Sequence, residues 1–386
     1  ASSPKGFYRI PVTAGTGLEA VYTATNKVPD TNYGGVAIDG VYYVAWQYDF
    51  YGITLVNYVD AYDMNTWEKL SHTEIKSLGM FASDVSLDPI SGKVFGCYIN
   101  NDGERFLGAV VGPYANRIAK GSFTLDGTEY SLPINNNGQT LHGGLEGLDR
   151  VVWDVVSASE DRLVMKYLHA DGQEGFPGNL QIEMTYSLTP ENEFRIDYKA
   201  TTDKPTVVNL SHHPFFNLKG EGNGTILDHV VTINASHTTP VDSVLIPTGE
   251  IADVTGTPFD FRQPHAIGER IGADNEQLRN GAGYDHNWVL DRKTADGIEP
   301  AATVWEPASG RTIEVLTDQP AMQFYSGNFF DGKANGKYGK PLRYRESLAL
   351  ETQKYPDSPN HDNFPSTVLR PGEEYTQVCI YRFGVK

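Results

Sequence analysis

The sequence has 386 residues, of which 49 are acidic and 31 basic, so the formal net charge is −18 at pH 7. This charge repels nucleic acids and anionic membranes, and no local basic patch offsets it, so we expect neither as a partner. Two distant cysteines, Cys97 and Cys379, exclude a disulfide framework and a multi-cysteine zinc site, and we expect both thiols to be buried. No apolar run reaches the ~18 residues that predict a membrane-spanning helix.

The start of the chain gives an expectation about location. Residues Ala1, Ser2, Ser3 and Pro4 carry no signal-peptide core. This slightly favours a cytoplasmic protein, and a periplasmic or secreted protein is expected instead if a signal peptide has been removed. The partner that we expect is a small molecule, bound by a monomer or a homodimer.

Residues 33–101 are rich in predicted strands but differ in texture from the rest of the chain. The strand-like runs with their turns are residues 40–48, 62–70 and 87–98. Together they resemble one blade of a β-propeller, which cannot bury its own faces because propellers close by radial repetition. We therefore expect residues 1–386 to form one β domain, with residues 33–101 packed on its outside.

Further along the chain, runs of β-branched and aromatic residues alternate with turn-forming clusters of Gly, Asn, Asp and Pro. The predicted strands are residues 121–132, 163–169, 180–188, 194–201 and 230–234. Long helical periodicity is almost absent, and 39 Gly and 22 Pro residues suit many tight turns. An all-β sandwich of more than about 200 residues can remain one domain, and we predict such a fold.

Two polar stretches come first in this region. Asn116 and Arg117 follow an apolar run and could bind ligand hydroxyl groups, although an isolated Asn-Arg pair is more often a turn or surface feature. The loop at residues 135–144 contains His142, followed by two glycines that permit close approach of the backbone. By itself, His142 is more typical of a loop or supporting histidine than of a catalytic one.

Two adjacent histidines lie in residues 207–218, an otherwise apolar strand with flanking aromatic residues. Adjacent residues on a strand face opposite sides. We therefore predict that His212 and His213 do not share a site, so that one faces a functional site and the other the core or the surface. This argues against a metal site built from both.

The last polar stretches are residues 283–288, 320–328 and 348–357. In the third, Glu351 closes an apolar run. Burial would raise the pKa of its carboxyl group, which suits a general base. A solvent-exposed glutamate at the end of a strand is an equal alternative for this residue.

Taken together and in this order, the stretches resemble the aldose 1-epimerase (galactose mutarotase) family from about Gly108 to Phe383. Residues 171–178, 240–249, 257–262 and 363–372 add to the resemblance, whereas residues 33–101 do not follow the family pattern. The resemblance implies a large antiparallel β-supersandwich with a sugar cleft on one concave face.

The resemblance also implies roles for individual residues. It makes Glu351 the general base and His213 the general acid. The implied sugar-binding residues are Asn116, Arg117, His142, Asp285 and Gln323. The family stretch Thr-Asn-His-x-Tyr-Phe-Asn-Leu reads Ser-His-His-Pro-Phe-Phe-Asn-Leu here, so His212 replaces an Asn, and Phe215 replaces a Tyr whose hydroxyl is expected to be missing.

The implied activity is the interconversion of the α and β anomers of free hexoses such as glucose and galactose. The anomeric hydroxyl loses a proton while the ring oxygen gains one, and the open aldehyde rotates and closes on its other face. We expect Glu351 as a carboxylate and His213 as an imidazolium to carry out these transfers. We expect no cofactor, because no nucleotide loop is present, and no metal, because the histidines are dispersed along the chain.

Three alternatives stay open at this point. A glycoside hydrolase would use two carboxylates about 5–10 Å apart, and Glu351 and Asp285 could be these two carboxylates. A catalytically silent carbohydrate-binding module of the same fold is favoured if residues 33–101 distort the cleft. An epimerase for phosphorylated hexoses would need extra basic residues at the site, which the strong acidity makes less favourable.

Overall fold

The computed structural model describes residues 106–294, 296–336 and 340–386 in full, together with the backbone of eight strands between residues 6 and 99. Contacts divide the chain into two compact units, Ala1–Arg105 and Phe106–Lys386. The seven site residues predicted from the sequence belong to the second unit.

The first unit contains antiparallel strands. They are β1 (Gly6–Arg9) with β2 (Glu19–Thr23), the sheet of β3 (Thr31–Ile38), β4 (Val41–Phe50), β5 (Ile53–Asp63) and β6 (Lys69–Ile75), and the pair β7 (Phe81–Leu87) with β8 (Val94–Ile99). The strand-rich character predicted for residues 33–101 is thus present. Its side chains, including that of Cys97, lie outside the described residues, so the predicted packing on the sandwich and the single-domain organisation stay predictions.

Expressing residues 33–101 alone tests that organisation. We expect no cooperative thermal unfolding transition from the isolated segment, because a single blade-like unit leaves strand edges and a sheet face uncovered. Circular dichroism during heating measures this directly. A cooperative transition would make the segment a separate domain.

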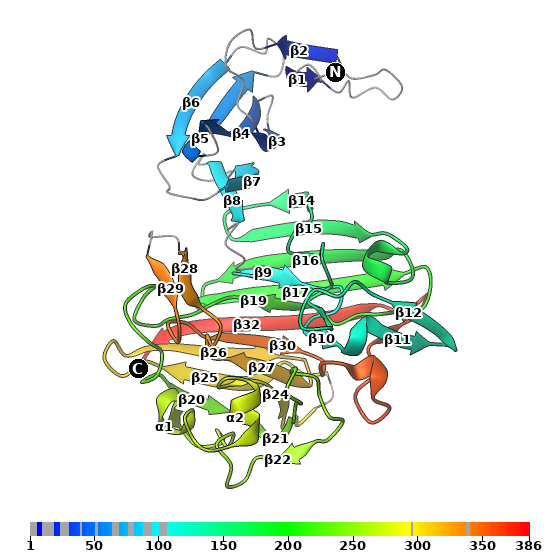
Figure 1. Ribbon diagram of the computed structural model, residues 1–386, viewed down its shortest axis with the longest axis vertical. Coiled ribbons are helices and arrows are strands. Elements are labelled where there is room, and N and C mark those ends of the chain that lie inside the picture. Colours follow the sequence, from blue (N-terminus) through cyan, green and yellow to red (C-terminus); the bar gives the residue numbers. More distant parts are fainter. Residues whose placement is uncertain are drawn as a thin grey trace. The chain divides into compact units, whose positions relative to one another are not determined.

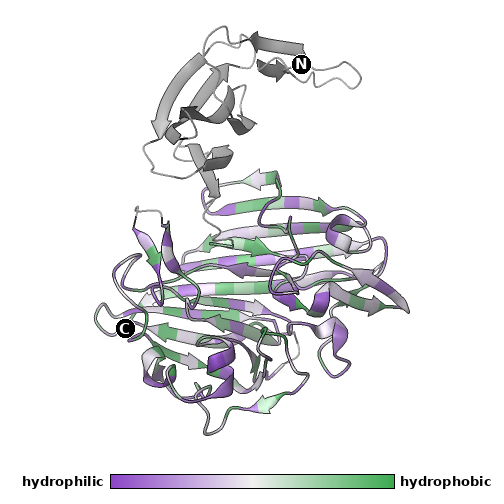
Figure 2. Cartoon of the chain, in the orientation of Figure 1, coloured by the Kyte–Doolittle hydropathy of each residue, from purple (hydrophilic) through white to green (hydrophobic). Residues whose placement is uncertain are grey.

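The largest layer of the second unit is a nine-stranded antiparallel sheet. In spatial order its strands are β14 (Asp154–Ala158), β15 (Arg162–His169), β16 (Leu180–Thr189), β17 (Glu193–Thr202), β32 (Tyr375–Val385), β26 (Arg311–Thr317), β25 (Glu299–Trp305), β20 (Val230–Ile233) and β23 (His265–Ala266). The C-terminal strand β32 lies between β17 and β26 in the middle of the layer (Figure 1). The start of β16 alternates in burial, since Leu180 and Ile182 are buried and Gln181 is exposed, and Figure 2 shows polar and apolar bands along the strands of this layer.

The second layer is a five-stranded antiparallel sheet. Its strands, in order, are β22 (Ala252–Asp253), β21 (Ala235–Thr239), β24 (Asp285–Leu290), β27 (Ala321–Tyr325) and β30 (Ala349–Gln353). Trp288, Phe324 and Leu350 from this sheet share one buried cluster with Leu180 and Ile182 of the larger sheet. The two sheets therefore pack as layers of a sandwich, which confirms the predicted all-β class.

A short strand pair lies beside the second layer. It consists of β9 (Ala109–Val111) and β19 (Ser211–His213). The Ser211 hydroxyl donates a hydrogen bond to the carbonyl oxygen of Thr352 at 2.9 Å, which joins β19 to β30. This contact brings the predicted histidine strand next to the strand of Glu351.

The remaining elements are short. They are the pairs β10 (Arg117–Ile118) with β13 (Thr140–Leu141), β11 (Ser122–Leu125) with β12 (Thr128–Ser131), β18 (Thr206–Val207) with β31 (Val368–Leu369) and β28 (Asp331–Asn335) with β29 (Pro341–Arg343), the helices α1 (Ile267–Arg270) and α2 (Glu276–Asn280), and the 3-10 turns η1 (Ala119–Gly121), η2 (Gln173–Gly175) and η3 (Ser358–Asn360). Of the helices in the described part of the chain, none has the length and apolar character to cross a bilayer.

Two strand predictions need correction. The run predicted as one strand at residues 207–218 contains only the end of β18 and the short strand β19. The run predicted as a single strand at residues 121–132 is the hairpin of β11 and β12. Asp126 and Gly127 form its turn, with φ values of 51° and 80°. Asp-Gly is a sequence that favours such tight hairpin turns, because both positions need positive φ.

Candidate active site

A row of polar side chains crosses three neighbouring strands of the second layer. Asn287 in β24 is the register partner of Gln323 in β27, which is in turn the partner of Glu351 in β30. Asp285 lies two residues before Asn287, and its carboxylate accepts a hydrogen bond from the Gln323 amide at 2.7 Å. Because side chains two residues apart share a sheet face, the face opposite the core carries this polar row.

The two histidines of β19 point in opposite directions, as predicted. His213 Nε2 lies 3.4 Å from Glu351 Oε1. His212 Nε2 lies 2.7 Å from the Tyr186 hydroxyl, and the His212 ring packs edge-on against Tyr186 and Phe194. His213 therefore belongs to the polar row, and His212 belongs to the side of the strand that faces the aromatic core.

Three more predicted residues come from the loops and short strands around β10. The Asn116 side-chain oxygen accepts a hydrogen bond from the backbone N–H of Arg117 at 2.9 Å, and Arg117 Nε donates to Asn136 at 3.3 Å. The His142 ring centroid lies 5.4 Å from that of His213. The Arg117 guanidinium is buried, and the charges of Asp285 and Glu351 oppose the lowering of its pKa by burial. The structure thus brings all seven predicted residues together.

Burial controls the protonation of the central pair. It raises the pKa of Glu351 well above the ordinary value, and the Asp285 charge adds to this, while Arg117 partly offsets it. It lowers the pKa of His213 to about 4. Burial therefore favours the protonated form of Glu351 and the neutral form of His213, the reverse of the carboxylate and imidazolium predicted from the sequence.

Opposing effects also set the pKa of the Asp285 carboxyl group. Burial raises it, and the Arg117 charge and the hydrogen bond from Gln323 lower it. Two oxygens in the row, Glu351 Oε2 and Gln323 Oε1, are buried with no hydrogen-bond partner among the described residues. Buried polar atoms of this kind need an explanation, and a polar ligand would satisfy them.

The dispersal of the histidines along the chain was a wrong reason to expect no metal site. The fold gathers His142, His213 and Glu351, and one ligand-type atom of each lies within 4.8 Å of the others. Imidazole and carboxylate are the donors that zinc sites use. Dispersal of histidines along the sequence therefore says nothing here about their distances in space.

Aromatic rings complete the surroundings of the histidines. Phe215 stacks on His213 with a centroid distance of 4.8 Å. The ring of Phe106 lies 4.6 Å from His142 and 6.4 Å from His213. Tyr325 lies 6.4 Å from His213. Tyr325 was not among the residues predicted from the sequence, although its position two residues after Gln323 indicates the same face. Phe106 carried no sequence signal.

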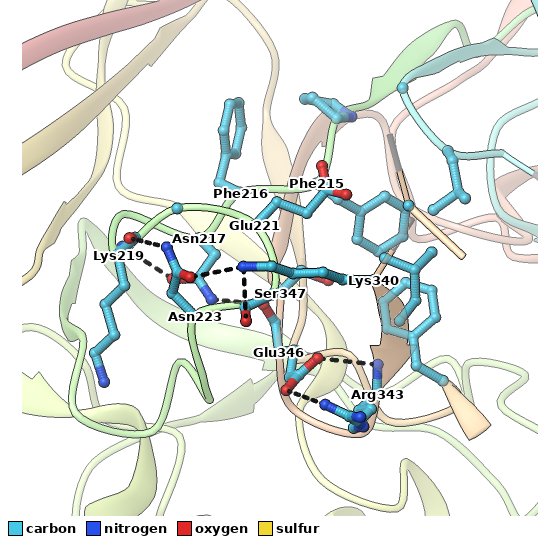
Figure 3. A pocket seen from close by; sticks show the side chains of 18 of the residues that line it. Phe215, Phe216, Asn217, Lys219, Glu221, Asn223, Lys340, Arg343, Glu346 and Ser347 are labelled. Atoms are coloured by element: carbon cyan, nitrogen blue, oxygen red, sulfur yellow. Dashed lines mark hydrogen bonds and ion pairs between the residues drawn. The ribbon is translucent and has the colours of Figure 1, made fainter. Parts of the chain in front are cut away.

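A pocket of about 810 Å³ adjoins this cluster. Phe215 lines it, together with Phe330, the loop after β19 and the β28–β29 hairpin. Figure 3 shows Lys340 reaching Asn223, with a hydrogen bond of 3.0 Å, and Arg343 paired with Glu346. None of the seven predicted residues is among its described lining residues, so Phe215 is the residue that this pocket and the histidine cluster share.

Comparisons with known proteins agree with the resemblance. The sequence profile described as aldose 1-epimerase matches residues 92–382. The galactose mutarotase of Bos taurus is 42% identical over 326 residues, covering 84% of this chain and 91% of that protein. The aldose 1-epimerase of Escherichia coli K12 is 41% identical over 289 residues, covering 74% and 82%.

Solved structures show the same fold. An aldose epimerase homologue from C. elegans superposes with a TM-score of 0.68 at 28% identity, covering 92% of this chain and 99% of that one. The galactose 1-epimerase of Lactobacillus acidophilus gives 0.66 at 25% identity, covering 89% and 98%. The fold is thus the predicted β-supersandwich of the galactose mutarotase type, and the chain belongs to the aldose 1-epimerase family.

Proposed function

We propose that this protein is an aldose 1-epimerase that interconverts the anomers of a free hexose, with Glu351 as general base and His213 as general acid. The observation that carries the proposal is the buried pair of these side chains, with 3.4 Å between Oε1 and Nε2. Relatives named galactose mutarotases make galactose the first sugar to test. The proposed chemistry needs no cofactor.

The surrounding residues suit a neutral polyol. Beside the pair of Glu351 and His213, Asp285 offers a carboxylate that accepts hydrogen bonds, and Gln323 offers a side-chain amide. The Gln323 Oε1 atom has no hydrogen-bond partner among the described residues. Arg117 supplies a buried positive charge that can stabilise negative charge on a sugar oxygen. We therefore assign sugar binding to Asn116, Arg117, His142, Asp285 and Gln323.

The pair carries one proton that the reaction uses. With the proton on His213, Glu351 can accept the proton of the anomeric hydroxyl while His213 donates to the ring oxygen. Ring closure reverses both transfers. Burial favours the form of the pair in which Glu351 holds the proton. This form and the form with the proton on His213 contain the same number of protons, so a change of pH does not alter their ratio.

We expect a bell-shaped dependence of kcat/KM on pH. The rate falls below about pH 4, where His213 takes up a second proton and the pair loses its base. It also falls on the alkaline side, above the raised pKa of Glu351, because the shared proton is then lost and no acid is left. Polarimetry across pH, corrected for the uncatalysed rate, measures this. A rate that rises steadily with pH would contradict the shared proton.

Polarimetry of freshly dissolved α-galactose and α-glucose, with and without the protein, tests the function itself. We expect the approach to anomeric equilibrium to accelerate in proportion to protein concentration. Release of reducing sugar from aryl glycosides would favour the hydrolase alternative. Sugar binding by calorimetry without acceleration would favour the silent module, and acceleration restricted to phosphorylated hexoses would favour the third alternative.

A further inference from the structure

His142 and Asn116 hold each other through two hydrogen bonds. The backbone N–H of His142 donates to the carbonyl oxygen of Asn116 at 2.9 Å, and the backbone N–H of Asn116 donates to Nδ1 of the His142 ring at 3.0 Å. Both residues lie in the left-handed region, with φ of 63° for Asn116 and 50° for His142. Asn and His enter this region more readily than most residues. The main chain therefore fixes Nδ1 of this ring.

A hydrogen bond accepted at Nδ1 decides where the ring carries its proton. A neutral imidazole has one protonated and one unprotonated nitrogen. Because the Nδ1 lone pair receives the N–H of Asn116, the proton lies on Nε2. We propose that Asn116 is a positioning residue whose backbone N–H fixes His142 as the Nε2–H tautomer, which makes this imidazole a hydrogen-bond donor and closes the cluster to divalent cations.

A flip of the His142 ring by half a turn does not give an equally satisfied arrangement. A flip exchanges Nδ1 with the carbon Cδ2, and the Asn116 N–H then loses its acceptor in a residue that is only 4% exposed. Buried backbone N–H groups without a partner are rare because they are costly. The side-chain oxygen of Asn116 already accepts from the backbone of Arg117.

The tautomer has a consequence for metal binding. His142, His213 and Glu351 have the donor types and the spacing of a three-ligand site. A metal ion needs an unprotonated nitrogen lone pair. In His142, the Nδ1 lone pair is used by Asn116 and Nε2 carries the proton, so neither nitrogen coordinates unless the contact breaks. His213 and Glu351 alone are one ligand short of a catalytic zinc site with three protein ligands.

The role of the His142 Nε2–H as a hydrogen-bond donor to the ligand rests on the proposed function. If the ligand is a hexose, the Nε2–H of His142 donates to a sugar oxygen close to the Glu351 and His213 pair. The tautomer itself can be read in the free protein, without substrate. A failure of this inference is therefore distinguishable from a failure of the proposed activity.

Nitrogen-15 correlation spectra of the histidine rings in the full chain test the tautomer. We expect His142 to show a protonated, pyrrole-type Nε2 and an unprotonated, pyridine-type Nδ1. Loss of the same signals in either His142→Gln or His142→Asn assigns them, so that one misfolded variant does not stop the experiment. The reverse pattern, with the proton on Nδ1, would overturn the proposal.

Calorimetric titration with Zn²⁺ tests whether the cluster of His142, His213 and Glu351 excludes divalent cations. We expect the wild type either to bind no Zn²⁺ or to bind it with an affinity that His142→Gln leaves unchanged. His265→Gln, at a histidine paired with Glu269 outside the cluster, is the control for adventitious binding. Affinity that falls by about tenfold or more in His142→Gln alone would overturn the proposal, because even outer partners of a metal ligand act on that scale.

Discussion

Replacing Glu351 by Gln is expected to slow mutarotation by about 10²–10⁴-fold, the range that one positioned acid or base contributes. The amide keeps the shape of the carboxyl group but cannot accept the anomeric proton. The fold should persist, because the uncharged amide resembles the protonated carboxyl that burial favours at this position. Polarimetry measures the rate, and thermal unfolding measures the stability.

A matched substitution elsewhere shows whether the effect is local. Glu183 forms a surface ion pair with Lys166 at 3.1 Å, remote in sequence from the polar row. Surface pairs contribute little to stability, so Glu183→Gln should keep the wild-type rate and melting temperature. If Glu351→Gln also kept the wild-type rate, Glu351 would not be the base.

Replacing His213 by Asn is expected to reduce the rate far more than replacing His212 by Asn. His213 faces Glu351, whereas His212 faces Tyr186 and Phe194. The His212 variant should instead lose about 1–3 kcal/mol of unfolding free energy, because it leaves the half-buried Tyr186 hydroxyl without its partner.

Paired measurements on the two variants separate the roles. Rates at substrate saturation report on the acid, and urea unfolding reports on the core contact. Equal losses of rate in both variants would contradict the opposite orientations of the two side chains. A large loss of rate in His212→Asn alone, with unchanged stability, would place His212, and not His213, in the reaction.

Local sequence patterns were sufficient for much of the fold. The strand predicted at residues 180–188 is β16, Leu180–Thr189, and the one at 194–201 is β17, Glu193–Thr202, because both runs are rich in β-branched and aromatic residues. The opposite orientation of His212 and His213 followed from strand geometry alone. The hairpin at residues 121–132 was missed, although Asp126 and Gly127 carry the turn signal.

Other properties depend on contacts between distant parts of the chain. The seven site residues were identified by resemblance to a family, since no spacing rule places Arg117 beside Asp285. The fold alone reveals that His142 meets His213 and Glu351, and that Nδ1 of His142 meets the backbone of Asn116. The protonation of Glu351 and His213 also required the structure, because burial sets it and the sequence does not give burial at a strand end.

The row formed by Asn287, Gln323 and Glu351 depends on register as well as on residue identity. Side chains alternate between the two faces, so inserting or deleting one residue within β27 would turn Gln323 toward the core and Phe324 toward the sugar side. Every residue type needed for the reaction would still be present, and yet the polar row would be broken. Length changes in these strands should therefore be tolerated far less than substitutions in the loops that join them.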